Sequence, residues 1–210
     1  MNAKTPTLTS IALMAAVTVI MAQIAIPMPA GVPMTLQTLA VTMAGVILGA
    51  KRGAVSMLIY LLLGAVGLPV FSGFRGGLAM LVGPTGGFLI SFPIMAFIIG
   101  LGAASHQANL SGKAASTIST TTSGSASSAT LSSPKSASKK ENPLSAIRFW
   151  GFLITGTIIN YIIGTAMFCF STGSSLSAGI AACVIPFIPT TIIKALIGGI
   201  LGLRIRRAVS

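Results

Sequence analysis

The sequence predicts an all-α membrane protein with six transmembrane helices and with both termini in the cytoplasm. Hydrophobic residues make up 53% of its 210 residues and charged residues only 7%, whereas a soluble domain carries about 25% charged residues. Thirteen basic residues stand against a single acid, Glu141, which gives a net charge of +12. The basic residues cluster between apolar spans, which is typical of cytoplasmic loops and not of a nucleic-acid surface.

Six apolar runs predict the spans, and prolines, glycines or basic residues separate them. The runs cover residues 8–26, 35–50, 53–68, 87–104, 147–170 and 178–203, the last interrupted early by Pro186 and Pro189. Several lie near the short limit of about 17 residues for a bilayer crossing. With the N-terminus inside, every basic residue except Arg75 and Lys194 falls in a cytoplasmic segment, which the positive-inside rule favours.

The first span carries Ala12 and Ala16 four residues apart, so they lie on one face of a helix. Small residues at this spacing let a second helix approach closely. Two interpretations are equally supported here: packing within this chain, or docking to a partner membrane protein.

Residues 105–143 differ in composition from the rest of the chain. Seventeen of these thirty-nine residues are Ser or Thr and none is aromatic, so the segment cannot bury a core. We expect a disordered cytoplasmic loop between the fourth and fifth spans, within a single integral-membrane domain that covers residues 1–210. His106, near the start of this loop, is expected to be solvated.

The stretch 67–88 interrupts the apolar pattern between the third and fourth spans. Seven glycines and two prolines can hold its backbone away from helical geometry. Irregular backbone near membrane depth is tolerated where protein buries it or a cavity hydrates it. We therefore expect this stretch, which contains Arg75, to form the wall or rim of a binding cavity.

The two cations outside the cytoplasmic segments indicate an anionic ligand. Lys194 lies within the sixth span, where a charge is costly unless it faces water, a partner or a ligand. No Asp or Glu occurs in any span, so we expect the ligand to supply a carboxylate. The near absence of acids and of histidine also argues against an enzyme, a metal site or a cofactor. The chain lacks a P-loop, so another component must supply energy for accumulation.

Four segments resemble the BioY family of biotin transporters in order and spacing. They are residues 27–39 (PMPAGVPMTLQTL), 60–71 (YLLLGAVGLPVF), 83–87 (GPTGG) and 186–194 (PFIPTTIIK). Members of this family are substrate-binding (S) components of energy-coupling factor (ECF) transporters. The resemblance implies six transmembrane helices in the bacterial cytoplasmic membrane, high-affinity capture of biotin from outside, and a cavity near the outer surface.

The resemblance also implies partners. The first helix, through Ala12 and Ala16, would pack on a transmembrane coupling subunit that a pair of ATPases drives, although some members are thought to work without these partners. Biotin, membrane lipids and these subunits are the expected partners, and no nucleic acid is expected. Two alternatives stay open: an S component for another small carboxylated vitamin, and a small secondary carrier or channel, which the broken spans would also suit.

A biotin site needs apolar walls, a few polar partners for the urea-like head and one or two cations for the carboxylate tail. The predicted substrate-binding residues are Thr35, Gln37, Phe71, Phe74, Arg75, Gly83, Thr85, Asn160, Tyr161, Thr191 and Lys194. Met34 is a further candidate for the walls. Gln37 has an alternative role in a helix–helix hydrogen bond.

One position departs from the family pattern. The family carries Pro-x-Asp-x-x-Lys near the sixth helix, and this chain has Thr191 where the aspartate stands. A threonine hydroxyl accepts a hydrogen bond more weakly than a carboxylate. Recognition of the ureido group therefore rests on Asn160, Gln37 or Thr191.

Overall fold

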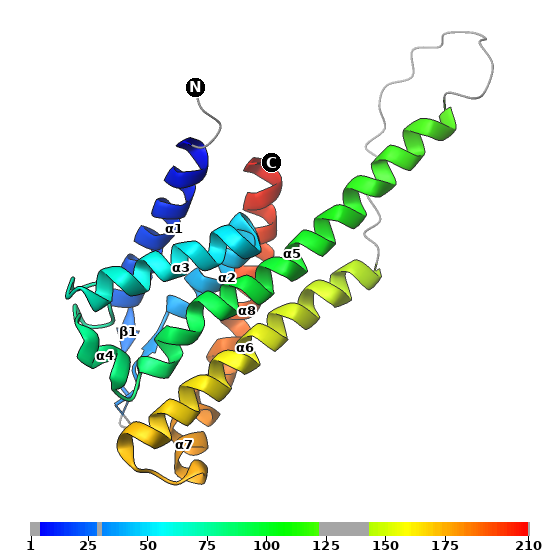
Figure 1. Cartoon of the computed structure of the whole chain (residues 1–210). Coiled ribbons are helices and arrows are strands. Elements are labelled where there is room, and N and C mark those ends of the chain that lie inside the picture. The colour runs from blue at the N-terminus through cyan, green and yellow to red at the C-terminus, as the bar shows by residue number, and fades with distance from the viewer. Residues whose placement is uncertain (1–4, 29–30, 122–142, 210) are drawn as a thin grey trace.

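The computed structural model describes residues 5–28, 31–121 and 143–209, which form a helical protein with one small β-hairpin (Figure 1). Its elements in chain order are α1 (Thr5–Gln23), β1 (Ala25–Ile26), β2 (Met34–Thr35), α2 (Gln37–Leu48), α3 (Ala50–Ala65), α4 (Leu78–Val82), α5 (Gly86–Thr121), α6 (Pro143–Thr172), α7 (Leu176–Cys183), the 3-10 turn η1 (Ile185–Phe187) and α8 (Ile188–Val209).

Three segments are long and apolar enough to cross a bilayer. They are Gly86–His106 in α5, Leu144–Thr172 in α6, and Leu176–Arg206, which runs from α7 into α8. Shorter apolar helices cover Thr7–Gln23 and Gln37–Leu48. The start of α1 and the end of α8 lie at one end of the molecule, and α4, α7 and the hairpin lie at the other (Figure 1). The coarse prediction, a helical membrane protein, is confirmed.

Helix α5 is the centre of the packing. It contacts α6, α3 and α2, and α2 in turn contacts α8. Large apolar side chains fill the space between these helices, including Met57, Tyr60, Ile99, Phe149 and Leu153, all nearly inaccessible. This core fixes the helices around α5, while the hairpin, the loop after α3 and α4 cover the end of the bundle away from the termini.

The sixth predicted span is divided where its prolines predict. Helix α7 ends at Cys183, η1 contains Pro186, and α8 begins at Ile188. Proline interrupts a helix interior but is tolerated in a first turn, because the missing N–H would have no helical partner there. This break places Thr191 and Lys194 in the first two turns of α8.

The segment 105–143 differs in part from the expected disordered loop. Helix α5 continues to Thr121, since an alanine-containing sequence without proline can extend an existing helix without a new nucleation step. His106 is only 3% exposed and packs against the Phe149 ring, so the expectation of a solvated histidine is wrong. Residues 122–142 lie outside the described part of the chain, and the disorder expected there stays a prediction.

The first part of the glycine-rich stretch, residues 67–77, forms a compact loop before α4. Phe71 and Arg75 pair as an antiparallel bridge, with the Phe71 N–H donating to the Arg75 carbonyl oxygen at 2.9 Å. A Cβ at Gly76 would lie 2.2 Å from a backbone carbonyl oxygen, so only glycine fits this position. Gln23, at the end of α1, anchors the loop because its Nε2 donates to the Phe71 carbonyl and its Oε1 accepts from the Phe74 N–H.

Candidate functional site

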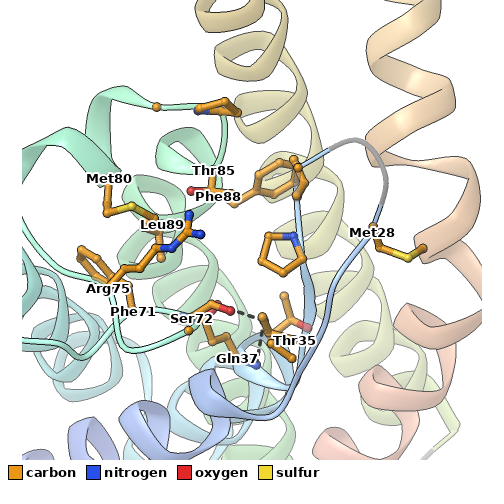
Figure 2. Close-up of a pocket in the computed structure, with 18 of the residues that line it drawn as sticks. Met28, Thr35, Gln37, Phe71, Ser72, Arg75, Met80, Thr85, Phe88 and Leu89 are labelled. Atoms are coloured by element: carbon orange, nitrogen blue, oxygen red, sulfur yellow. Dashed lines mark hydrogen bonds between the residues drawn. The ribbon is translucent and has the colours of Figure 1, made fainter.

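A cavity of about 600 Å³ lies at the end of the bundle away from the termini, and it is lined by several parts of the chain, including the first turn of α2 and η1. The β-hairpin, the loop after α3, α4 with the start of α5, the middle of α6 and the first turns of α8 each contribute side chains. Figure 2 shows labelled side chains from the hairpin segment, the start of α2, the loop after α3, α4 and the start of α5 around one space. Chain segments more than 150 residues apart therefore meet here.

The cavity brings together ten of the eleven predicted substrate-binding residues. These are Thr35, Gln37, Phe71, Arg75, Gly83, Thr85, Asn160, Tyr161, Thr191 and Lys194. Their meeting in one place is an observation, and their contact with a ligand stays a prediction.

Two predicted wall residues do not line the cavity. Phe74 is 72% exposed and has a left-handed backbone (φ 55°), held by the bond from its N–H to Gln23. Met34 packs instead against the small apolar cluster around Phe168, Cys183 and Phe187. Successive strand residues point to opposite faces, so with Thr35 on the cavity side Met34 faces away from it.

Gln37 is held by a hydrogen-bond network inside the protein. Its Nε2 donates to the Tyr60 hydroxyl at 2.5 Å, and that hydroxyl donates to the Val70 carbonyl at 3.1 Å. Its Oε1 accepts from the Thr35 hydroxyl at 2.9 Å (Figure 2). The alternative role of Gln37, a hydrogen bond between helices, is therefore present: this amide ties α2 to α3 and to the backbone just before Phe71.

Lys194 reaches the hairpin from α8. Its Nζ donates to the Thr35 carbonyl oxygen at 2.6 Å, and the residue is half-buried. A carbonyl oxygen satisfies one N–H of an ammonium group but carries no compensating charge. The only acid of the chain, Glu141, lies outside the described residues, so no described side chain can pair with Lys194.

Arg75 stands on a different wall of the cavity. Its side chain is exposed at the mouth and extends from the loop toward Thr85 and Phe88, whereas Thr35 lies on the hairpin across the cavity (Figure 2). The described residues form no ion pair with it. The two cations thus approach one space from two sides, Arg75 from the loop and Lys194 from α8.

Asn160 offers an acceptor deep in the cavity. It is 2% exposed, and its Nδ2 donates to the Ser91 hydroxyl at 2.6 Å and to the Phe88 carbonyl at 3.2 Å. Both amide hydrogens are then used on α5, and nothing in the described chain donates to Oδ1. Oδ1 is not one of the fully buried polar atoms that lack a partner, so this oxygen can accept a hydrogen bond from a group in the cavity.

Tyr161 and Thr191 close the side of the cavity between α6 and α8. Their hydroxyl groups are hydrogen-bonded to one another. The Tyr161 ring also meets Phe88 edge-on, with ring centroids 6.2 Å apart. This pair gives the cavity a wall that is apolar in its body and has hydroxyl groups at its edge.

Several lining residues were not predicted. Met28, Met80, Phe88, Leu89, Phe92 and Phe187 add apolar side chains to the lining. Phe88 and Phe92 could have been found, because they are four residues apart on the helix that follows the Gly83–Gly87 motif and so share a face. Met28 gave no such signal because it lies in an irregular segment, and Met80 gave none because α4 is only five residues long, too short to show a helical period.

The fold and the cavity define a class: a helical membrane protein with a cavity of a size for a small molecule. The chain belongs to the BioY family, whose family profile matches residues 1–210. The family resemblance of the sequence is thereby confirmed.

Two relatives and one solved structure show how far the similarity extends. "Biotin transporter BioY2" of Lactococcus lactis subsp. cremoris is 35% identical over 209 residues, which cover 100% of this chain and 94% of the relative. "Probable biotin transporter BioY" of Pyrococcus horikoshii is 53% identical over 92 residues, covering 44% of this chain and 56% of the relative, little more than half of its length. The crystal structure of an S-component for biotin from an ECF-type ABC transporter matches with a TM-score of 0.71 and 28% identity, over 99% of this chain and 95% of that chain.

Proposed function

We propose that this chain captures biotin at the outer face of the cytoplasmic membrane and acts as the S component of an ECF-type transporter. The observation that carries the proposal is the cavity: two cations that no described acid neutralises meet apolar walls and a free amide acceptor in one space. The chain is similar to proteins named biotin transporters and to the structure of an S-component for biotin. This similarity supports biotin as the ligand of the cavity.

The positions of the polar groups suggest how biotin lies. One side of the cavity is formed by α6 and α8, which carry Asn160, Thr191 and Lys194. On this side, Asn160 Oδ1 and the Thr191 hydroxyl accept hydrogen bonds from the two ureido N–H groups of biotin. Lys194 donates a hydrogen bond to the ureido oxygen. Arg75 stands across the cavity at the mouth, and its planar fork matches a carboxylate. The apolar bicycle then lies against Phe71, Phe88 and Tyr161.

The proposed topology has six crossings with both termini in the cytoplasm. The six crossings are supplied by α1, α2, α3, α5, α6 and the α7–α8 unit. The start of α1 and the end of α8 lie at the same end of the molecule in Figure 1, which supports an even number of crossings. The basic residues near the termini favour this end as the cytoplasmic one. In a Cys169→Ala, Cys183→Ala background, Ser210→Cys should resist a membrane-impermeant thiol reagent in right-side-out vesicles, and labelling would contradict this orientation.

The exposure of α1 supports docking to a coupling subunit. Ala12 and Ala16 are exposed, whereas Ala15 and Thr18, on the neighbouring face, are buried against the rest of the bundle. The small residues are therefore not used for packing within this chain. A helix with this face toward lipid can accept a partner helix at close distance.

The experiment that tests the proposed function is equilibrium binding of labelled biotin to the detergent-purified chain in the absence of nucleotide. We expect saturable binding at one site per chain, and Lys194→Met should weaken it. Biotin that is not retained by the folded wild-type chain would refute the proposed substrate. Concentrative uptake by vesicles containing only this chain would refute the requirement for other subunits.

A further inference from the structure

The loop of residues 67–77 is held at its base by α3. Phe71 is fully buried and meets the Tyr60 ring edge-on, with ring centroids 5.6 Å apart. The Tyr60 hydroxyl donates a hydrogen bond to the Val70 carbonyl at 3.1 Å. These contacts fix the start of the loop, but they do not reach its tip, residues 72–75.

A single side chain forms hydrogen bonds at the tip. The Phe74 N–H donates to Gln23 Oε1 at 2.9 Å, while Gln23 Nε2 donates to the Phe71 carbonyl at 3.2 Å. In the described part of the chain, no other side chain is hydrogen-bonded to residues 72–75. Gln23 is the last residue of α1 and does not line the cavity, so it acts on the loop from outside the site.

The bond to Gln23 holds an unfavourable backbone. Phe74 has a φ of 55°, and Gly73 before it has a φ of 72°. A left-handed backbone is costly for a residue with a Cβ, and the exposed Phe74 side chain has little packing to offset this cost. The chain turns at this residue, so that Phe74 points outward and Arg75, the next residue, lines the cavity.

The position of Arg75 depends on the backbone of the loop. Its partner in the antiparallel bridge is Phe71, whose N–H donates to the Arg75 carbonyl at 2.9 Å. A two-stranded hairpin is at best marginally stable on its own, and here only one residue pair is bridged. The Arg75 side chain is exposed, and no described acid pairs with it. The guanidinium is therefore placed by the turn that precedes it.

We propose that Gln23 is a positioning residue for carboxylate recognition: from the end of α1 it fixes the Phe74 backbone, so that Arg75 faces the carboxylate of biotin before the ligand binds. This inference rests on the proposed biotin site. A loop that is ordered in advance raises affinity, because its ordering does not oppose binding. The ureido partners come from α6 and α8, so loss of Gln23 should affect the tail of biotin and not its head.

The test measures the affinity of the detergent-purified, full-length Gln23→Met protein for biotin and for biotinol, the alcohol that lacks the carboxylate. Methionine is close to glutamine in length but has no N–H donor and only a weak acceptor. We expect the affinity for biotin to fall about 3- to 10-fold, the effect of one neutral hydrogen bond. The affinity for biotinol should change less than about twofold. If Gln23→Met does not fold, Gln23→Ala makes the same deletion with a smaller side chain.

Two further variants supply a control and a rescue. Thr18, also on α1, is buried, and its hydroxyl donates to the Met14 carbonyl of the same helix, so Thr18→Val should keep both affinities. Asparagine adopts a left-handed backbone more readily than phenylalanine. Phe74→Asn, added to the Gln23→Met protein, should therefore recover part of the lost preference for biotin.

The outcomes separate this inference from the proposed function. A wild-type chain that retains no biotin would refute the proposed site itself. If the wild-type chain prefers biotin and the folded Gln23→Met protein keeps the same preference, Arg75 does not depend on Gln23 and the inference is wrong. Equal losses for both ligands would also overturn it, because they would show a general role in stability. A loss that Phe74→Asn does not reduce would show that Gln23 does not act through the Phe74 backbone.

Discussion

At the scale of single residues, charge and polarity in an apolar sequence were the most informative signals. Lys194 stood out because a charge is costly in a span without a partner, and Thr191 because it replaces the aspartate of the family pattern. The structure places both at one cavity with Asn160. Side-chain direction was harder to predict. Met34 faces away from the cavity because side chains alternate along the strand. Phe74 faces away because its backbone is left-handed.

His106 shows the limit of composition as a guide. Its Ser-rich neighbourhood predicted solvent exposure, yet the helix continues through it and turns its ring toward Phe149 on α6. Gln37 shows a related limit, because the sequence identified a costly amide but could not reveal that Tyr60, on another helix, is its partner.

Thr191 gives a residue-scale prediction. Thr191→Val keeps the shape and removes the hydroxyl, so biotin affinity of the purified chain should fall about 3- to 10-fold, the effect of one neutral hydrogen bond of roughly 0.5–1.5 kcal/mol. Thr190→Val is the matched control, because the Thr190 hydroxyl bonds to the Phe187 carbonyl and does not line the cavity. Equal losses in both variants would remove Thr191 from the site.

At the scale of elements, prolines and glycines predicted boundaries well and lengths less well. The break at Pro186 and Pro189 appears as η1. The stretch 67–88 lines the cavity as expected, although it contains helix α4 and the start of α5 and is irregular only in part. The extension of α5 to Thr121 was missed, because a helix that is already formed propagates through residues of modest propensity.

Gly76 gives a prediction for the loop. Gly76→Ala places a Cβ 2.2 Å from a backbone oxygen, so the loop must shift, at a cost of about 1–3 kcal/mol. We expect a lower midpoint of thermal unfolding together with weaker biotin binding, because this loop carries Phe71 and Arg75. Gly151→Ala is the control, because a Cβ at Gly151 on α6 would have nothing within 4 Å. This variant should not lower the midpoint of thermal unfolding. A similar fall of the midpoint in Gly151→Ala would mean that the loss in Gly76→Ala does not arise from the loop.

The exposed face of α1 gives a second element-scale prediction. The double variant Ala12→Leu, Ala16→Leu should bind biotin as the wild type does, because neither residue lines the cavity, but should lose uptake in cells that contain the coupling subunits, because the close helix contact is blocked. Ala104→Leu, an exposed alanine on α5, is the control. Uptake at the wild-type level in the double variant would place the docking surface elsewhere.

At the scale of the whole molecule, the proposed function separates binding from energy supply. Its charges are arranged so that the spans contain cations but no acid, and no P-loop is present in the sequence. A scaffold of packed helices around α5 holds a cavity at the end away from the termini. The sequence predicted this division from the placement of its charges and the lack of a P-loop, whereas the pairing of Tyr161 on α6 with Thr191 on α8 required the structure.

The most direct test of this account compares the affinity of the isolated chain for biotin and for biotinol, the neutral alcohol analogue. The wild-type chain should prefer biotin at least about tenfold, since a hydrogen bond to a charged group contributes roughly 1.5–3 kcal/mol. Arg75→Gln should bring the two affinities together, and Lys194→Met should weaken both. Equal affinity of the wild-type chain for the acid and the alcohol would contradict the claim that the ligand's carboxylate completes the unpaired charge of the cavity.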